Sequence, residues 1–169
     1  MTDPRYPIGE FDVGQSRGRE QNIAAVEALP AELGRAVAGL SEDQLEIKYR
    51  EGGWTLRQTV HHVADSHSNA FIRFKLALTE DLPVIRPYYE DRWAELGDSR
   101  LPVDISLQHL QVLHFRWAAL LRSMSEADYE RRFIHPDTGE WRLADVLALY
   151  VWHGRHHTAQ ILNAPVHQR

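Results

Sequence analysis

Apolar residues recur every three or four positions along long stretches of this chain, and this spacing constrains the fold more than any other feature. The clearest stripes are Ile23, Val26, Leu29, Leu33 and Val37, and then Leu107, Leu110, Leu113 or His114, Trp117 and Leu121. An α-helix brings such positions to one face, which must be buried against other helices. Strand patterns are sparse, apart from a short pairing around Phe133 and Trp141. The sequence therefore predicts an all-α four-helix bundle.

Capping and breaking residues set the expected limits of the helices. We expect long helices over about 19–39, 55–79, 104–124 and 142–163. Ser41-Glu-Asp-Gln44 and Thr55-Leu-Arg-Gln58 have the capping-box pattern that starts a helix. Asp104 is the expected N-cap of the third long helix. Pro30 lies inside the first helix and predicts a kink or a break there.

The connections suggest how the helices are arranged. Prolines and glycines mark a long crossover, about 81–103, between the second and third long helices, and 1–18 reads as an irregular arm. The whole chain, 1–169, is long enough for one domain with its own core. Both halves of the chain run from a short capped turn through a tryptophan into a long helix, so helices 55–79 and 142–163 are expected to face each other.

Composition excludes several classes of function. The formal net charge is −5, and lysines and arginines are scattered, which argues against nucleic-acid binding. The chain has no cysteine, so disulfides, thiolate-bound metals and a catalytic protein thiol are ruled out. No stretch of 18 apolar residues and no signal-peptide pattern is present, so we expect no membrane partner and a cytoplasmic location.

Ten histidines are many for 169 residues, and one pair has the spacing of metal ligands. His153 and His157 stand four residues apart in an apolar stretch, on one face of the expected helix. Such pairs also arise by chance, but uncharged imidazoles without partners are costly inside an apolar helix, and a metal ion would satisfy them. Gly154 occupies the position of the general-base glutamate of zinc peptidases, which excludes that class.

A third ligand is expected from the facing helix, where a polar stripe follows the helical period. The stripe consists of Gln58, His62, Asp65 or Ser66, Asn69 and Arg73. Long polar stripes are usually solvated, but this one has short hydrogen-bonding side chains rather than lysine and glutamate, which favours the bundle interior. His62 lies at its centre, whereas His61 points about 100° away and is expected to be a packed or capping residue.

Three neutral imidazoles would leave a bound ion with open positions, as in catalytic metal sites. A thiol or water bound there would lose its proton more readily. Asp65, Asn69 and Arg73 are then the candidates for catalytic or substrate-contacting residues, against the alternative that they are solvated surface groups. His114 and His156 are more simply explained as structural residues, and no role is predicted for His67.

Two segments carry a family resemblance. Residues 52–67, GGWTLRQTVHHVADSH, and 149–157, LYVWHGRHH, resemble the DinB-like four-helix metalloproteins, and most closely their YfiT branch. Members of that branch are described as metal-dependent hydrolases and as bacillithiol S-transferases. The likeness extends to 6–9, 73–80 and 135–138, and so covers nearly the whole chain.

The resemblance implies a zinc or nickel ion, one per chain, bound by His62, His153 and His157 in a homodimer. Gln160 stands where close relatives often have a further histidine, which makes a fourth imidazole ligand doubtful. The function it implies is a thiol S-transferase that joins a small thiol to electrophilic substrates in detoxification. The alternatives are a hydrolase acting through metal-bound hydroxide, a non-catalytic metal-binding stress protein, and a bundle whose histidines are merely packed.

Overall fold

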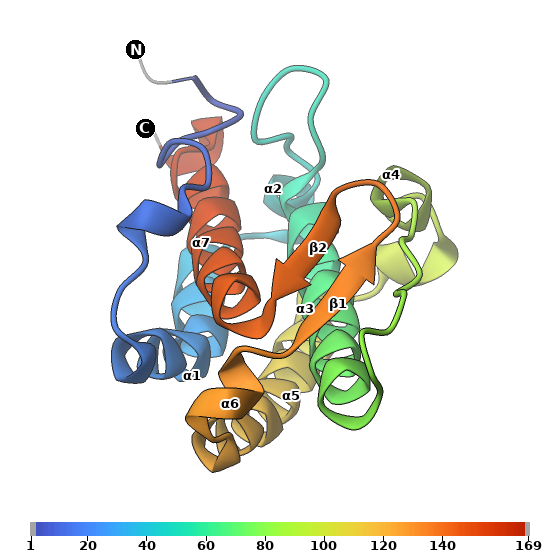
Figure 1. Ribbon diagram of the computed structural model, residues 1–169. Coiled ribbons are helices and arrows are strands. Elements are labelled where there is room, and N and C mark those ends of the chain that lie inside the picture. The colour runs from blue at the N-terminus through green and yellow to red at the C-terminus, as the bar shows by residue number, and fades with distance from the viewer. Residues whose placement is uncertain (1–2, 168–169) are drawn as a thin grey trace.

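The computed structural model describes residues 3–167 and contains four long helices beside several short elements (Figure 1). The long helices are α1 (Arg19–Val37), α3 (Leu56–Thr79), α5 (Val103–Ser123) and α7 (Leu143–Leu162). The short elements are η1 (Val13–Gln15), α2 (Glu42–Leu45), α4 (Glu90–Trp93), η2 (Gly97–Arg100), α6 (Glu126–Tyr129), β1 (Arg132–His135), β2 (Gly139–Arg142) and η3 (Pro165–His167). The predicted all-α bundle is confirmed.

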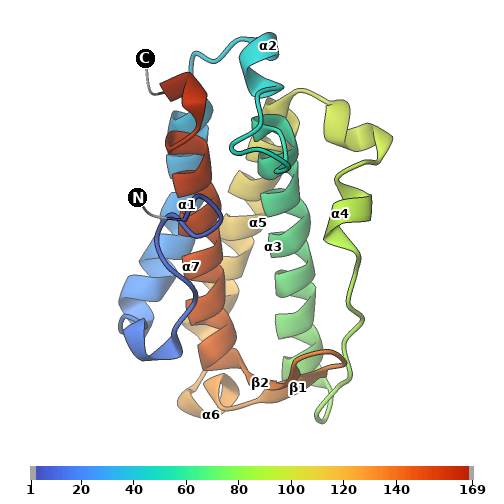
Figure 2. The ribbon, with the colours of Figure 1, turned by 90° about the horizontal axis from the view of Figure 1, so that it is seen from above.

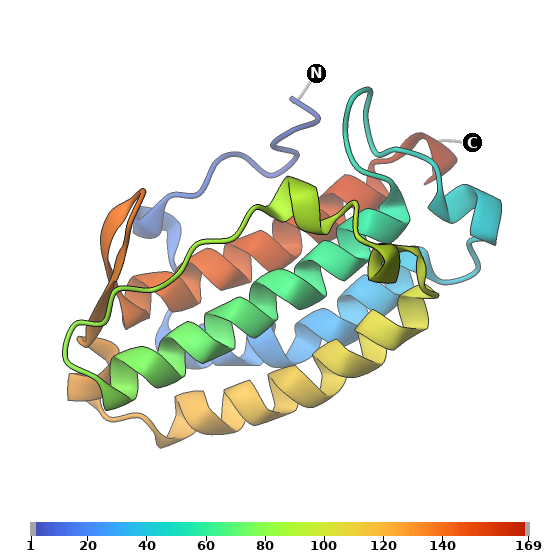
Figure 3. The same ribbon diagram turned by 90° about the vertical axis from the view of Figure 1, so that its right-hand side faces the viewer.

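The helices form a ring that does not follow their order in the chain. α1 packs against α5 and α7, and α3 packs against the same two helices, so α1 and α3 lie diagonally opposite (Figure 2). α3 and α7 are therefore neighbours, as the similarity of the two halves predicted. The crossover between α3 and α5 follows the outside of α3 and includes α4 and η2 (Figure 3). No helix within the described residues has the length and apolar character needed to cross a bilayer.

The helix starts match the sequence with one exception. Ser41 and Thr55 each form a complete capping box, in which side chain and backbone bond reciprocally with the third helical residue. The prediction for Asp104 is wrong: Pro102 is the N-cap of α5, and Asp104 lies in the first turn. Proline is readily accommodated where a helix begins because no intrahelical N–H is needed there, and an acidic first turn still suits the helix dipole.

Pro30 predicted a kink or a break, and of these the break does not occur, because α1 is one continuous helix through Pro30. Proline has no N–H to donate to the carbonyl four residues earlier, which here belongs to Val26. That carbonyl instead accepts a hydrogen bond from Nδ1 of His114 on α5, at 2.5 Å. An interhelical bond thus replaces the intrahelical one.

Two apolar clusters fill the bundle, one toward each end. Large members of the first are Phe74, Trp117, Leu121, Leu143 and Leu147, and of the second Leu33, Leu56, Leu110 and Ile161. The antiparallel hairpin of β1 and β2 lies across the end of the bundle near the first cluster and pairs Phe133 with Trp141, as predicted. Between the clusters, α3, α5 and α7 contribute a layer of histidines.

Candidate metal centre

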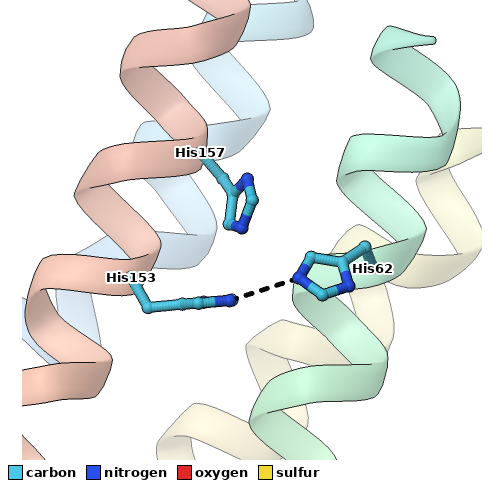
Figure 4. A group of neighbouring side chains, drawn as sticks. All are labelled: His62, His153 and His157. Carbon is cyan, nitrogen blue, oxygen red and sulfur yellow. Dashed lines mark hydrogen bonds between the residues drawn. The ribbon is translucent and has the colours of Figure 1, made fainter. Parts of the chain in front are cut away.

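Three histidines converge between α3 and α7 (Figure 4). Nε2 of His62 lies 3.2 Å from Nε2 of His153, and one ring nitrogen of each of His62, His153 and His157 lies within 4.8 Å of the others. Two nitrogens bound tetrahedrally to one zinc ion at 2.0–2.1 Å lie about 3.4 Å apart. The three rings are thus already close to the spacing that one ion requires, and the predicted set is brought together as a group.

Gly154, between the two histidines of α7, lies where this helix closely approaches α1. Gly154, directly after His153, is buried against Leu29, and an added Cβ would lie 2.4 Å from Leu29 Cδ2. The position that holds a glutamate in zinc peptidases therefore faces a neighbouring helix here, and a side chain at this position would clash with Leu29 unless Leu29 shifted. The sequence-based exclusion of a peptidase has a steric basis.

The ring of His157 is oriented by a hydrogen bond behind it. Its Nδ1 lies 2.8 Å from Oε1 of Gln160, whose amide nitrogen donates to the backbone carbonyl of Arg5 in the N-terminal arm. Because the amide oxygen can only accept, Nδ1 of His157 carries the proton and Nε2 is left with a lone pair. Gln160 thus orients a candidate metal ligand, from the position where close relatives were expected to have a further histidine.

Burial keeps the three rings uncharged. It lowers the pKa of His62 to about 4, and it lowers those of His153 and His157 well below the usual range, with smaller contributions from neighbouring imidazoles. Their side chains are therefore neutral at pH 7 and present lone pairs rather than charges. Trp54 packs against this group, with its ring centroid 4.5 Å from that of His62 and 6.3 Å from that of His157.

A cavity of about 490 Å³ opens beside the three histidines. Its wall includes Ser66 and Arg73 of α3, Tyr88 of the crossover, His135 of β1 and Tyr150 of α7. Burial raises the pKa of Tyr150. The charge of Arg73 and the hydrogen bonds with Ser66 and Arg73 lower this pKa, but by less than burial raises it. Within residues 3–167 no carboxylate forms an ion pair with Arg73, so its charge faces the cavity without a fixed counter-ion.

The other two polar residues predicted for the site lie elsewhere on α3. Asp65 and Asn69 are not among the residues that line this cavity, and the amide of Asn69 donates to the backbone carbonyl of Asp65 at 2.9 Å. Burial raises the pKa of Asp65 to about 6, with a further contribution from the charge of Asp98 in η2. Ser66, the alternative at this point of the stripe, is the residue that reaches the cavity.

The remaining buried histidines have different surroundings. His61 bonds through its two ring nitrogens with Ser106 Oγ, at 2.7 Å, and the carbonyl of Leu101, at 2.9 Å, which fits the packed residue that was predicted. His156 stacks on Trp152 at 4.5 Å between centroids and contacts the amide of Gln160. His67, which had no predicted role, bonds through Nε2 with Nδ1 of the candidate ligand His153 at 3.2 Å. The helical period of the sequence gave no indication of this contact.

Fold and site together define a helical-bundle protein with a candidate three-histidine metal centre. The sequence pattern of the DinB superfamily matches residues 25–161, and the chain belongs to this superfamily. It is 56% identical over 164 residues to a protein of Bacillus cereus (strain AH820) named "Putative metal-dependent hydrolase", with 95% of each chain covered. A protein of the same name from Bacillus mycoides (strain KBAB4) is 55% identical over the same length and coverage.

Solved structures show the same architecture. YfiT from Bacillus subtilis, described as a probable metal-dependent hydrolase with an unusual four-helix bundle topology, matches with a TM-score of 0.91 and 48% identity over 95% of this chain and 94% of that one. The mycothiol-dependent maleylpyruvate isomerase matches with a TM-score of 0.70 and 15% identity, over 90% of this chain and 63% of that one. The second likeness establishes the fold alone.

Proposed function

We propose that this chain is a metal-dependent thiol S-transferase. It binds one divalent transition-metal ion, zinc or nickel, through His62, His153 and His157, and joins a small bacillithiol-like thiol to electrophilic substrates. The observation that carries the proposal is the convergence of three neutral imidazoles at the wall of a cavity large enough for small substrates. The names of the 55–56% identical relatives support dependence on a metal.

A bound divalent ion supplies the chemistry by lowering the pKa of a thiol that reaches its open side. The chain contributes no thiol of its own, so the sulfur must come from a cosubstrate. In the transfer, the thiolate sulfur forms a bond to an electrophilic carbon. The leaving group departs with its bonding electron pair, and the thiol proton passes to solvent.

Arg73 is the residue we assign to substrate binding. Its guanidinium faces the cavity without a described counter-ion, beside the hydroxyl groups of Ser66 and Tyr150. Guanidinium groups bind carboxylates in bidentate geometry, so a carboxylate on the thiol or the electrophile would be oriented there. Asp65 and Asn69 do not line the cavity, so we assign them no contact with the substrate and only a structural role within α3.

The second candidate function is hydrolysis by metal-bound hydroxide, which the names of the relatives favour. This reaction needs a general base within reach of the attacking water. Asp65, the base suggested by the sequence, does not line the cavity, and Glu90 and Asp137, which do, are exposed. Among the described residues, the cavity thus has no buried carboxylate to act as a general base, which supports thiol transfer over hydrolysis. A non-catalytic metal-binding stress protein is the third candidate.

The remaining proposals follow from the family resemblance. We propose that the chain forms a homodimer and acts in the cytoplasm in detoxification. Analytical ultracentrifugation of the metal-loaded protein tests the first of these directly. A sedimentation coefficient of a single 19.5 kDa chain at micromolar concentration would exclude a stable dimer.

One assay separates the three functions. The metal-loaded protein is incubated with a bacillithiol-like thiol and a chromogenic aryl halide, and in parallel with a chromogenic ester and no thiol. We expect conjugation faster than that given by the same concentration of free ion, and abolished in the double variant H153A/H157A. Faster ester hydrolysis without conjugation would favour the hydrolase. Acceleration of neither reaction would leave the metal-binding function.

A further inference from the structure

A chain of hydrogen bonds leads from α1 to the candidate metal centre. It begins at the Val26 carbonyl, which Pro30 leaves without its usual helical donor. His114 Nδ1 lies 2.5 Å from this oxygen, and His114 Nε2 lies 3.0 Å from His67 Nδ1. His67 Nε2 in turn lies 3.2 Å from Nδ1 of His153. Two side chains, His114 of α5 and His67 of α3, thus connect a backbone carbonyl of α1 to the candidate ligand His153 on α7.

The starting point fixes the direction of every proton in the chain. A carbonyl oxygen only accepts, so His114 must donate from Nδ1, and its Nε2 then has a lone pair. His67 must donate to that lone pair from Nδ1, which leaves its own Nε2 as an acceptor. His153 must then carry its proton on Nδ1. The remaining nitrogen of His153, Nε2, is the one that faces His62 across the candidate metal site.

The surroundings suit such a chain. His67 and His114 are 0% and 1% exposed, and their rings are nearly parallel, 17° apart at 4.9 Å between centroids. Trp117 packs edge-on against both rings, and Tyr150 packs edge-on against His67. In an enclosure of this kind water does not compete for the ring nitrogens, and each neutral imidazole depends on its neighbour for its hydrogen bonds.

We propose that His67 and His114 are positioning residues that fix the tautomer and ring orientation of the metal ligand His153, with the Val26 carbonyl freed by Pro30 as their anchor. This rests on the proposed metal-binding function of His153. Partners behind a metal-binding imidazole hold its ring in place and strengthen it as a ligand, and their removal costs about 10–100-fold in metal affinity. Histidines that were only packed would stabilise the fold without this effect.

The tautomers can be observed without any metal. In the metal-free protein with 15N-labelled histidine, the ring resonances of His67, His114 and His153 should each show a protonated Nδ1 and an unprotonated Nε2. A proton on Nε2 of any of the three would overturn the proposal. This result is independent of whether the protein binds a metal, so it is separate from a failure of the proposed function.

Affinity measurements test the consequence. We expect H67L to raise the zinc dissociation constant by about 10–100-fold and H114L by about 10-fold. H61L is the matched control. It removes a buried, hydrogen-bonded histidine from the same helix but leaves the hydrogen bonds among His114, His67 and His153 in place. It should lose stability but keep the wild-type dissociation constant. In H114Q, an amide oxygen can accept from His67, and much of the affinity should return. An equal rise of the zinc dissociation constant in H61L and H67L would overturn the proposal.

Discussion

Gly154 of α7 lies so close to Leu29 of α1 that a Cβ would stand 2.4 Å from Leu29 Cδ2. We therefore expect Gly154→Ala to lower the free energy of unfolding by up to about 2 kcal/mol, because overpacking costs about 1–3 kcal/mol and better helix propensity returns about 1 kcal/mol. Urea denaturation of the metal-free protein measures this change. Combining Gly154→Ala with Leu29→Ala should cost less than the sum of the two single substitutions.

Gly34 of α1 provides the matched control for this prediction. The nearest atom to a Cβ added there is Leu107 Cδ1 at 3.9 Å, an ordinary contact. Gly34→Ala should therefore raise the free energy of unfolding by about 0.5–1 kcal/mol through helix propensity alone. If both alanines stabilised the protein, the close approach of α7 to α1 would not be the reason for Gly154.

Local patterns predicted the helices well because short-range physics determines them. The capping boxes at Ser41 and Thr55 and the apolar stripe of α1 depend only on neighbours within a few residues. The histidine pair of α7 has the same character, since positions four apart share a face. His62 followed from the type of side chain in its stripe, which distinguishes an interior polar face from a solvated one.

Features that depend on the packing between helices could not be predicted from the sequence. Pro30 inside the first helix predicted a kink or a break, but the helix continues, and the Val26 carbonyl bonds with His114, 88 residues away. The polar stripe of α3 also turned out to face two regions. Ser66 and Arg73 line the cavity, whereas Asp65 and Asn69 do not. A helical period defines a face to within one residue, and this is too coarse to choose between Asp65 and Ser66.

Asp65 should make stability depend on pH. Its pKa is about 6 in the folded protein against an ordinary value of 3.8, so between these values the folded chain binds more proton than the unfolded chain. The free energy of unfolding therefore falls as pH rises through this range. Asp65→Asn should raise it by on the order of 1 kcal/mol at pH about 7.5, after allowance for solvent screening, and by much less at pH about 4.5.

Denaturant titrations of the metal-free protein at both pH values would measure the effect of Asp65. Asp98→Asn should give a smaller change in the same direction, because its charge is the lesser cause of the raised pKa. An equal gain from Asp65→Asn at both pH values would show that the carboxyl group is not shifted.

Arg73 should affect substrate binding more than metal binding. In the conjugation assay, Arg73→Gln is expected to raise KM for a carboxylate-bearing substrate by about 10-fold or more, the loss of a charge-assisted hydrogen-bonded pair. The metal content should not change. Arg116→Gln removes the same charge from an exposed position on α5 and should have no effect. An unchanged KM in Arg73→Gln would remove this residue from the substrate site.

Gln160 should matter through His157. Gln160→Leu removes the acceptor of the His157 Nδ1 proton, and we expect the zinc dissociation constant to rise by about 10-fold. Thr158→Val is a suitable comparison, since the Thr158 hydroxyl bonds only with the Gly154 carbonyl among the described groups. Competition with a coloured chelator measures both variants. Comparable losses of affinity in the two would assign the effect to general loosening of α7.

The metal stoichiometry of the protein and its histidine variants tests the central claim most directly. After loading with zinc or nickel and exhaustive dialysis, elemental analysis should find one ion per chain in the wild type and in His61→Ala. The variant H62A and the double variant H153A/H157A should retain almost none, because each loses part of the set that converges between α3 and α7. If the double variant kept one ion per chain, His153 and His157 would not be the ligands, and the account of this site would be wrong.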